Sequence, residues 1–359
     1  MKKSKEAILD IESINHKFLR ELFSTFQDYD KNIPIILHNF PDPDAIASGL
    51  GMSIILKLFN LKCAGIYYSG EVSHPQNKSL VTLLNIMMTN FEKEPFEKGL
   101  HAICIDLNDV GESSNQPQIK KDYVKIKAII DHHKSKSVKG ATSDVRAVGS
   151  TSSIIYEYLN KLDYNFDTEE GAALATALLV GIKTDTQDLM SDNTSKLDLD
   201  AYEGLRKFVD KQKLISIINY PLPEYYFELR QVAHSPENKT FDHSTIVSGL
   251  GIISAAKRDS LPVIADEFLR MSSVQTSVVF AIIDNYIDIV VRSNEITLDV
   301  NDFIQNIFHT GGGKKGSGRA TIPLGFFEID SDDIELKDEI WKITRKIVTK
   351  KIMHNVKGE

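Results

Sequence analysis

The chain lacks the features typical of secreted and membrane-spanning proteins. Only two of its 359 residues are cysteines, Cys63 and Cys104, and they have no CxxC spacing, which predicts a reduced, cytoplasmic chain. The longest apolar run, 172–182, is shorter than the roughly 18–20 residues that cross a bilayer. The opening Met-Lys-Lys-Ser-Lys is soon followed by acidic residues, which predicts an amphipathic helix rather than a secretory leader.

An excess of basic residues is also absent. The 42 Lys and Arg are outnumbered by 50 Asp and Glu, which gives a net charge of −8. Because such a field repels nucleic acid, any phosphate-bearing partner requires a local basic patch or metal ions. The 42% hydrophobic and 26% charged residues are ordinary for a globular protein. At roughly 150 residues per domain, the length predicts two domains.

Short β-rich runs alternate with helical periodicity in the first half. The runs lie at 33–37, 101–105 and 126–130, and the helical segments at about 45–59, 150–162 and 170–182. This alternation predicts an α/β domain over residues 1–204, with a mostly parallel sheet and helices on both faces. Ligands bind beyond the carboxyl ends of the strands in such folds.

The pattern changes in the second half. Two closely spaced prolines, Pro221 and Pro223, lie in a predicted linker over 205–238. We expect a second, smaller α/β domain with a mixed sheet over 239–359, including strands at 245–253, 274–283 and 286–291, helices at 260–271 and 299–309, and a hairpin turn at 284–285. The run 340–351 predicts a solvated amphipathic helix.

Acidic or histidine residues follow each clear strand of the first half. The candidates are His38, Asp42 and Asp44 after the first strand, Asp106 after the second, Asp131, His132 and His133 after the third, and Asp185 at the end of an apolar helix. Imidazole and carboxylate groups gathered at one sheet edge suit Mn²⁺, Fe²⁺, Co²⁺ or Zn²⁺. Two such ions would clamp a phosphate ester.

Each candidate also has a purely structural interpretation. Asp42 or Asp44 could cap a helix, Asp106 a turn, and the two histidines could lie on the surface. Gly149-Ser-Thr-Ser152 is interpreted as a helix cap. Unrelated turn residues have no reason to repeat at every strand end, so their conjunction favours a metal site.

These motifs, in this order, resemble those of the DHH phosphoesterase superfamily. The resemblance covers about 30–325 and implies that His38 and Asp42 hold one metal, that Asp44, His132 and Asp185 hold the other, and that Asp106 bridges them. It also implies that Asp131 orients a ligand histidine and that His133 faces the substrate phosphate or leaving group.

The second domain is similar to the DHHA1-type accessory domain of RecJ-like and nanoRNase proteins. The similarity rests on Gly311-Gly312-Gly313, which follow Arg292 in the sequence. The glycines alone could form a surface loop, but Lys314, Lys315 and Arg319 make the segment locally basic. We therefore expect Arg292, Gly311–Gly313, Lys314 and Arg319 to bind substrate. Lys314 replaces the histidine found in many members of the family.

The sequence thus predicts a metal-dependent phosphoesterase that uses two divalent ions, with Mn²⁺ preferred. The resemblance implies short single-stranded RNA or DNA oligonucleotides or nucleotide phosphates such as 3′-phosphoadenosine 5′-phosphate (pAp) as substrates. A pyrophosphatase, an exopolyphosphatase or a cyclic-dinucleotide phosphodiesterase stays open, and a non-catalytic nucleotide-binding regulator is a more distant alternative. We expect no membrane partner, and a homodimer is an open possibility.

Overall fold

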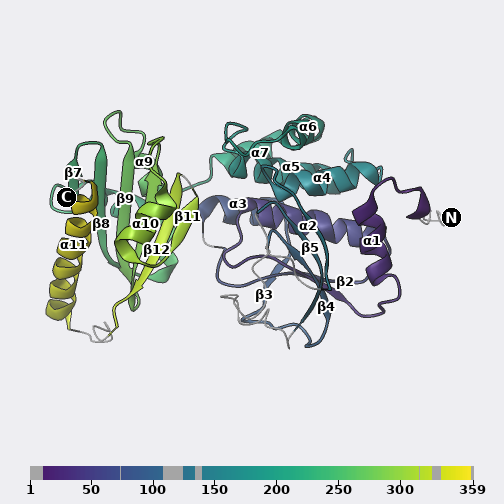
Figure 1. Ribbon diagram of the computed structural model, residues 1–359, viewed down its shortest axis with the longest axis horizontal. Coiled ribbons are helices and arrows are strands. Elements are labelled where there is room, and N and C mark those ends of the chain that lie inside the picture. The colour runs from purple at the N-terminus through teal and green to yellow at the C-terminus, as the bar shows by residue number, and fades with distance from the viewer. Residues whose placement is uncertain are drawn as a thin grey trace. The chain divides into compact units, whose positions relative to one another are not determined.

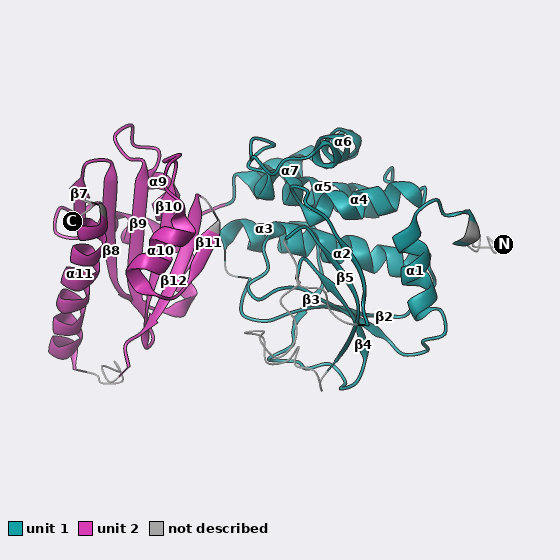
Figure 2. Cartoon of the chain, in the orientation of Figure 1, with its two compact units in different colours: residues 1–220 teal, residues 221–359 magenta. Residues whose placement is uncertain are grey.

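The computed structural model describes residues 11–72, 74–107, 124–133, 140–314, 316–325 and 333–356. The chain divides into two compact units, residues 1–220 and 221–359 (Figure 2). This division lies inside the predicted linker 205–238, but that segment also contains helices α7 and α8. In the described residues no helix is both long and apolar enough to cross a membrane.

Unit 1 contains a parallel sheet with the strand order β3-β2-β1-β4-β5-β6 (Figure 1). Its elements are η1 (Ile11–Ser13), α1 (Lys17–Phe26), β1 (Ile33–Ile36), α2 (Pro43–Leu58), β2 (Cys63–Tyr68), α3 (Pro75–Leu83), β3 (Met88–Asn90), β4 (His101–Ile105), β5 (Lys125–Asp131), β6 (Thr142–Val145), α4 (Thr151–Lys161), α5 (Glu169–Asp185), α6 (Lys196–Leu205) and α7 (Lys211–Ile218).

The helices pack on one face of this sheet. Strand residues such as Ile35, Ile103 and Ile130 point into the same core as α1, α2, α4 and α5. Phe91, Phe96 and Leu100 cover Ile36 and Cys104 on the opposite face. In the described residues no helix contributes to this second cluster, so the predicted helices are found there on one face of the sheet and not on both.

The strand order reverses between β1 and β4, which pair in parallel with Ile36 beside Cys104. From β1 the chain adds β2 and then β3 on one side of the sheet. It then adds β4, β5 and β6 on the other side of β1. Such a switch point opens a crevice at the carboxyl ends of the two strands, where ligands bind in open α/β sheets. The candidate site follows these strands and their neighbour β5.

Unit 2 has a mixed sheet with the order β11-β12-β10-β9-β8-β7, in which only β8 and β9 pair in parallel. Its elements are α8 (Glu224–His234), β7 (Lys239–Asp242), β8 (Thr245–Ile253), η3 (Ala255–Lys257), α9 (Ser260–Phe268), β9 (Thr276–Ile283), β10 (Tyr286–Ser293), α10 (Val300–Phe308), β11 (Gly312–Lys314), β12 (Ser317–Pro323) and α11 (Ile334–Val356). Helices α8 and α9 cover one face, and α10 and α11 the other.

The glycine-rich segment forms the β11–β12 hairpin rather than the surface loop of the structural interpretation. A Cβ on Gly311 would lie 2.3 Å from the Arg319 carbonyl oxygen, and one on Gly313 would lie 2.3 Å from that of Ser317. These two glycines are therefore needed for close approach of the strands. Gly312 is different, since the nearest atom to its Cβ would be Asn301 Oδ1 at 3.4 Å.

Candidate metal centre

The loop after β1 begins the site. Asp42 caps α2, because its carboxylate accepts a 3.0 Å hydrogen bond from the Ala45 N–H, and Pro43 occupies the first turn. The same Asp42 carboxylate lies 3.6 Å from His38 Nε2, which in turn is 3.7 Å from Asp106 Oδ2. Asp42 therefore both caps α2 and belongs to the cluster.

Asp44 lies two residues further along, in the first turn of α2, and is fully buried. Its two oxygens accept hydrogen bonds of 2.7 and 2.8 Å from the backbone N–H groups of Thr151 and Ser152, at the start of α4. A helix N-terminus stabilises a carboxylate, because its N–H groups lack partners within the helix. The approach is close because Gly181 of α5 has no side chain: a Cβ there would be 2.3 Å from Ser152 Oγ and 3.0 Å from the Asp44 Cα.

Asp106 ends β4 in a left-handed conformation, with φ of 53°, which an aspartate tolerates better than most residues. The Thr151 hydroxyl donates a 2.8 Å hydrogen bond to its Oδ1. No donor among the described residues forms a hydrogen bond to its buried Oδ2. A buried carboxylate oxygen that accepts no hydrogen bond is suited to bind a cation.

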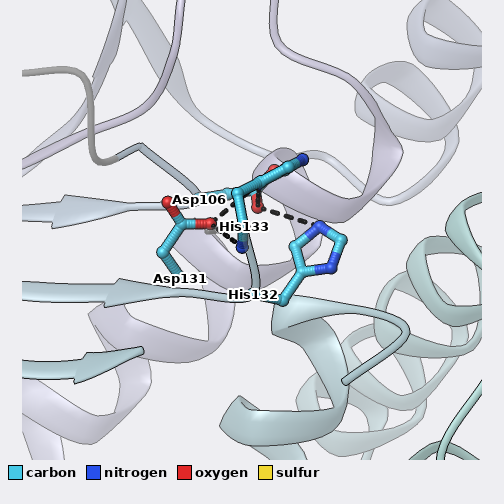
Figure 3. A group of neighbouring side chains, drawn as sticks. All are labelled: Asp106, Asp131, His132 and His133. Atoms are coloured by element: carbon cyan, nitrogen blue, oxygen red, sulfur yellow. Dashed lines mark hydrogen bonds and ion pairs between the residues drawn. The ribbon is translucent and has the colours of Figure 1, made fainter. Parts of the chain in front are cut away.

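The histidines after β5 complete the cluster. Nε2 of His132 lies 3.0 Å from Asp185 Oδ2, 3.6 Å from Asp106 Oδ1 and 3.9 Å from Asp44 Oδ2. Nδ1 of His132 is 3.1 Å from the Val148 carbonyl oxygen, to which it donates, so Nε2 is the nitrogen that faces the carboxylates. Figure 3 shows the Asp106 carboxylate between the His132 ring and the Asp131–His133 pair.

Asp131 forms hydrogen bonds with His133, whereas the resemblance implied that it orients a ligand histidine. Its Oδ1 is 2.9 Å from His133 Nδ1 and accepts a 3.0 Å hydrogen bond from the His133 backbone N–H. The ligand candidate His132 is oriented by a backbone carbonyl instead. Burial raises the pKa of Asp131, but the hydrogen bonds from His133 outweigh it and hold that pKa below its usual range. The His133 ring is partly exposed, with 42% of its side chain accessible.

Close packing of carboxylates and imidazoles shifts the pKa values of the site. Burial lowers the pKa of His38, but the hydrogen bond and charge of Asp42 outweigh burial and raise it to about 10. Burial and the charge of Asp42 raise the pKa of Asp106 to about 6, and burial with the charge of Asp106 raises that of Asp44 well above its ordinary value. These groups therefore bind protons more tightly than usual, and a divalent cation bound between the carboxylates would compete with those protons.

The geometry sorts the candidates into groups whose ligand atoms lie within 4.8 Å of one another. These are His38 with Asp42 and Asp106, then Asp44 with His132 and Asp185, and finally Asp106 with Asp131, His132 and His133. The first two groups are the ligand sets that the resemblance implied. Nitrogen and oxygen donors without thiolates suit Mn²⁺ and related divalent ions, so these residues fit a metal centre.

Sequence reasoning missed Asp198, which holds the start of α4 in place. This buried carboxylate accepts hydrogen bonds from the Gly149 N–H at 2.8 Å and from the hydroxyls of Ser150 and Ser153 at 3.2 and 2.6 Å. It also accepts bonds from the Ser195 N–H and hydroxyl, which form a capping box of α6. Burial raises its pKa, but the hydrogen bonds outweigh burial and lower it. The Ser195-x-x-Asp198 spacing was the available signal.

The predicted substrate-binding residues lie in unit 2. The Arg292 Nε is 3.0 Å from Asp266 Oδ1. The Arg319 guanidinium binds buried Asp288, to which Arg258 also donates a 2.6 Å hydrogen bond. Arg319 therefore forms an ion pair with Asp288 of the neighbouring strand β10, whereas we expected it to contact a phosphate. The backbone of Lys314 lies in β11, whereas its side chain and Lys315 are outside the described part of the chain.

Comparison with known proteins finds one family model and several similar chains. Residues 32–182 match the family model "DHH family, N-terminal domain". An uncharacterized protein of Methanocaldococcus jannaschii is 31% identical over 357 residues, which cover 98% of this chain and 70% of the relative. The structure of an exopolyphosphatase-related protein from Bacteroides fragilis matches with a TM-score of 0.63 at 14% identity, covering 92% of this chain and 97% of that one. A putative family II inorganic pyrophosphatase of Methanococcus jannaschii has a TM-score of 0.44 at 17% identity, covering 86% and 100%.

The fold and the site define a metal-dependent phosphoesterase. The chain belongs to the DHH family. The likeness to the Bacteroides fragilis structure covers both units and shows that they share its two-domain α/β architecture.

Proposed function

We propose that the protein hydrolyses short oligonucleotides or nucleotide phosphates, in the manner of nanoRNases and pAp phosphatases, with two divalent ions, preferably Mn²⁺. The observation that carries the proposal is a pair of neighbouring ligand groups, His38–Asp42–Asp106 and Asp44–His132–Asp185. Asp106 of the first group lies next to the second, with its Oδ1 3.6 Å from His132 Nε2. Ions bound there would neutralise phosphate charge and lower the pKa of water.

Other residues of unit 1 would position the ligands and transfer a proton. Thr151 and Ser152 hold the carboxylates of Asp106 and Asp44 in fixed orientations, so little reorganisation is needed when substrate arrives. Asp131 fixes the His133 ring through Nδ1, and His133 would hold a proton for a leaving oxygen or donate to a phosphate oxygen.

In this proposal, unit 2 recognises the nucleotide as a DHHA1-type domain. Gly312 allows a ligand to approach the β11 backbone, whose fold does not itself require a glycine there, and Lys314 and Arg292 supply positive charge. Gly311 and Gly313 shape the hairpin. We assign Arg319 to positioning that hairpin through Asp288.

A substrate panel tests the proposal. Purified full-length protein with Mn²⁺ is incubated with the dinucleotide pApA, pAp, cyclic di-AMP, pyrophosphate and polyphosphate, and the products are resolved by chromatography. Cleavage of pApA or pAp supports the proposal. Cleavage of polyphosphate, pyrophosphate or cyclic di-AMP alone would assign the protein to the corresponding alternative.

A matched pair of lysine variants tests the role of unit 2. Lys314→Ala should lower kcat/KM for pApA or pAp about ten- to a hundredfold, because one charge-assisted phosphate contact is worth roughly 1.5–3 kcal/mol. The small diester bis(p-nitrophenyl) phosphate, which offers no nucleotide, should be hydrolysed at an unchanged rate. Lys239→Ala, in the edge strand at the other side of the same sheet, is the control and should affect neither substrate.

A further inference from the structure

Helix α11 is anchored to the sheet of unit 2 by one of its faces. Val348 and Ile352 are buried in the core that α10 shares, and the Trp341 ring lies 5.6 Å from that of Phe280. Gly249 of β8 makes room for Trp341, since a Cβ there would be 2.6 Å from the indole. Figure 2 shows α11 running beside β8 in unit 2. The anchored face leaves the opposite residues of α11 directed away from the sheet.

A second apolar stripe runs along the outward side of α11. Leu336, Ile343 and Ile347 expose 43%, 60% and 51% of their surface, and Ile340 lies among them, half-buried. The spacing of four, three and four residues is the heptad pattern of a helix that packs against another helix. Isolated exposed apolar residues need no explanation, but a continuous stripe on one helix face marks an interaction surface.

The charges of α11 are divided along its length. Acidic residues dominate its first half, where Glu335, Asp338 and Glu339 follow Asp333. Basic residues dominate its second half, at Arg345, Lys346, Lys350 and Lys351. Two copies of this helix therefore complement each other only when they run antiparallel, because parallel copies would place like charges side by side.

We propose that α11 is a self-association surface through which two copies of the chain pair with these helices antiparallel. The two-fold axis would pass near Trp341 and Lys342. It would place Ile340 against Ile343 of the second copy, and Leu336 against Ile347 of the second copy. Glu339 would then face Lys346 of the second copy, and Asp333 would face Lys350. The same surface serves both copies, as a two-fold interface requires.

The oligomeric state of the full chain tests this proposal. Sedimentation velocity and light scattering across the micromolar range should show a dimer. Ile343→Glu should give a folded monomer with an unchanged circular-dichroism spectrum, because Ile343 is already largely exposed. Ile334→Glu is the matched control: Ile334 is 82% exposed but lies off the stripe, so this variant should stay dimeric. A monomeric wild-type protein, or a dimer that survives Ile343→Glu, would overturn the proposal.

Charge reversal tests the antiparallel arrangement. Glu339→Lys and Lys346→Glu should each weaken the dimer about tenfold, because symmetry turns two opposite-charge pairs into two like-charge pairs. The double variant restores both pairs with exchanged signs and should recover the dimerisation constant of the wild-type protein. Failure of the double variant to recover would show that Glu339 does not face Lys346, and the antiparallel register would be wrong.

Discussion

Replacing Asp198 should lower both the stability of unit 1 and the affinity of its metal centre, whereas a core variant should lower the stability alone. Asp198 touches no candidate ligand, but it holds Gly149, Ser150 and Ser153 at the start of α4. The following N–H groups of that helix orient Asp44. We therefore treat Asp198 as a positioning residue, whose loss should move Asp44 indirectly.

The magnitude follows from the hydrogen bonds that each variant removes. Asp198→Ala leaves the backbone N–H groups of Gly149 and Ser195 without their acceptor, and each unpaired buried donor costs about 1–3 kcal/mol. Because Ser195 is partly accessible to water, we expect a total loss of about 2–4 kcal/mol. Asp198→Asn can keep its oxygen toward both N–H groups and turn its amide toward the serine hydroxyls, so it should cost only about 1 kcal/mol.

The assay compares unfolding with metal affinity. Asp198→Ala should bind Mn²⁺ about tenfold more weakly and lose turnover to match, the low end of the range for removing a direct partner of a metal ligand, because Asp198 acts on Asp44 through α4. Leu22→Ala is the control: it removes buried side-chain volume in α1 at a comparable cost of about 2–5 kcal/mol, but it should leave Mn²⁺ affinity unchanged. If Asp198→Ala is destabilised yet binds Mn²⁺ like the wild-type protein, our reasoning about α4 is refuted.

Three further predictions concern both units. Thr151→Val removes the hydroxyl that donates to buried Asp106 Oδ1, so turnover should fall about tenfold and the free energy of unfolding by about 1–3 kcal/mol, and unchanged kinetics would speak against this role. Excess chelator should abolish hydrolysis, and Mn²⁺ or Co²⁺ should restore it best; full activity after dialysis against chelator would exclude the metal centre. Burial raises the pKa of Asp288, but Arg319 and Arg258 outweigh burial and lower it, so its stabilising contribution is complete above about pH 4 and is lost as the pH falls through the lowered pKa. Acid titration followed by circular dichroism should therefore show a shallower loss of stability for Asp288→Asn than for the wild-type protein.

The sequence predicted those parts of the fold that carry strong local periodicity. The buried strands β1, β4 and β5 and the helices α2, α4 and α5 lie within a few residues of their predicted positions. Strands β2, β3 and β6 escaped prediction, because short strands at the sides of a sheet have mixed burial and little apolar periodicity. Hairpin β11–β12 escaped because its glycines are typical of loops, and only the close approach of two backbones explains them.

The candidate site was predictable to the extent that its residues follow strands directly. His38, Asp106 and His132 all do, and parallel strands bring their carboxyl ends to one edge. The supporting contacts were not predictable, because Asp198 is 49 residues from Gly149 along the chain and only the packing of α6 beside α4 brings them together. For the same reason, the pairing of Arg319 with Asp288 across two neighbouring strands was not evident from a basic segment.

The most direct test of the central claim is hydrolysis of bis(p-nitrophenyl) phosphate by metal-stripped protein to which Mn²⁺ is returned, with Asp106→Ala beside the wild type. Asp106 is the one carboxylate common to two of the ligand groups and is buried among them. We predict Mn²⁺-dependent turnover by the wild-type protein and a loss of orders of magnitude in the variant, which should remain folded because carboxylate repulsion is relieved. Comparable turnover by a folded Asp106→Ala protein, or hydrolysis by the wild type without any metal, would contradict the account.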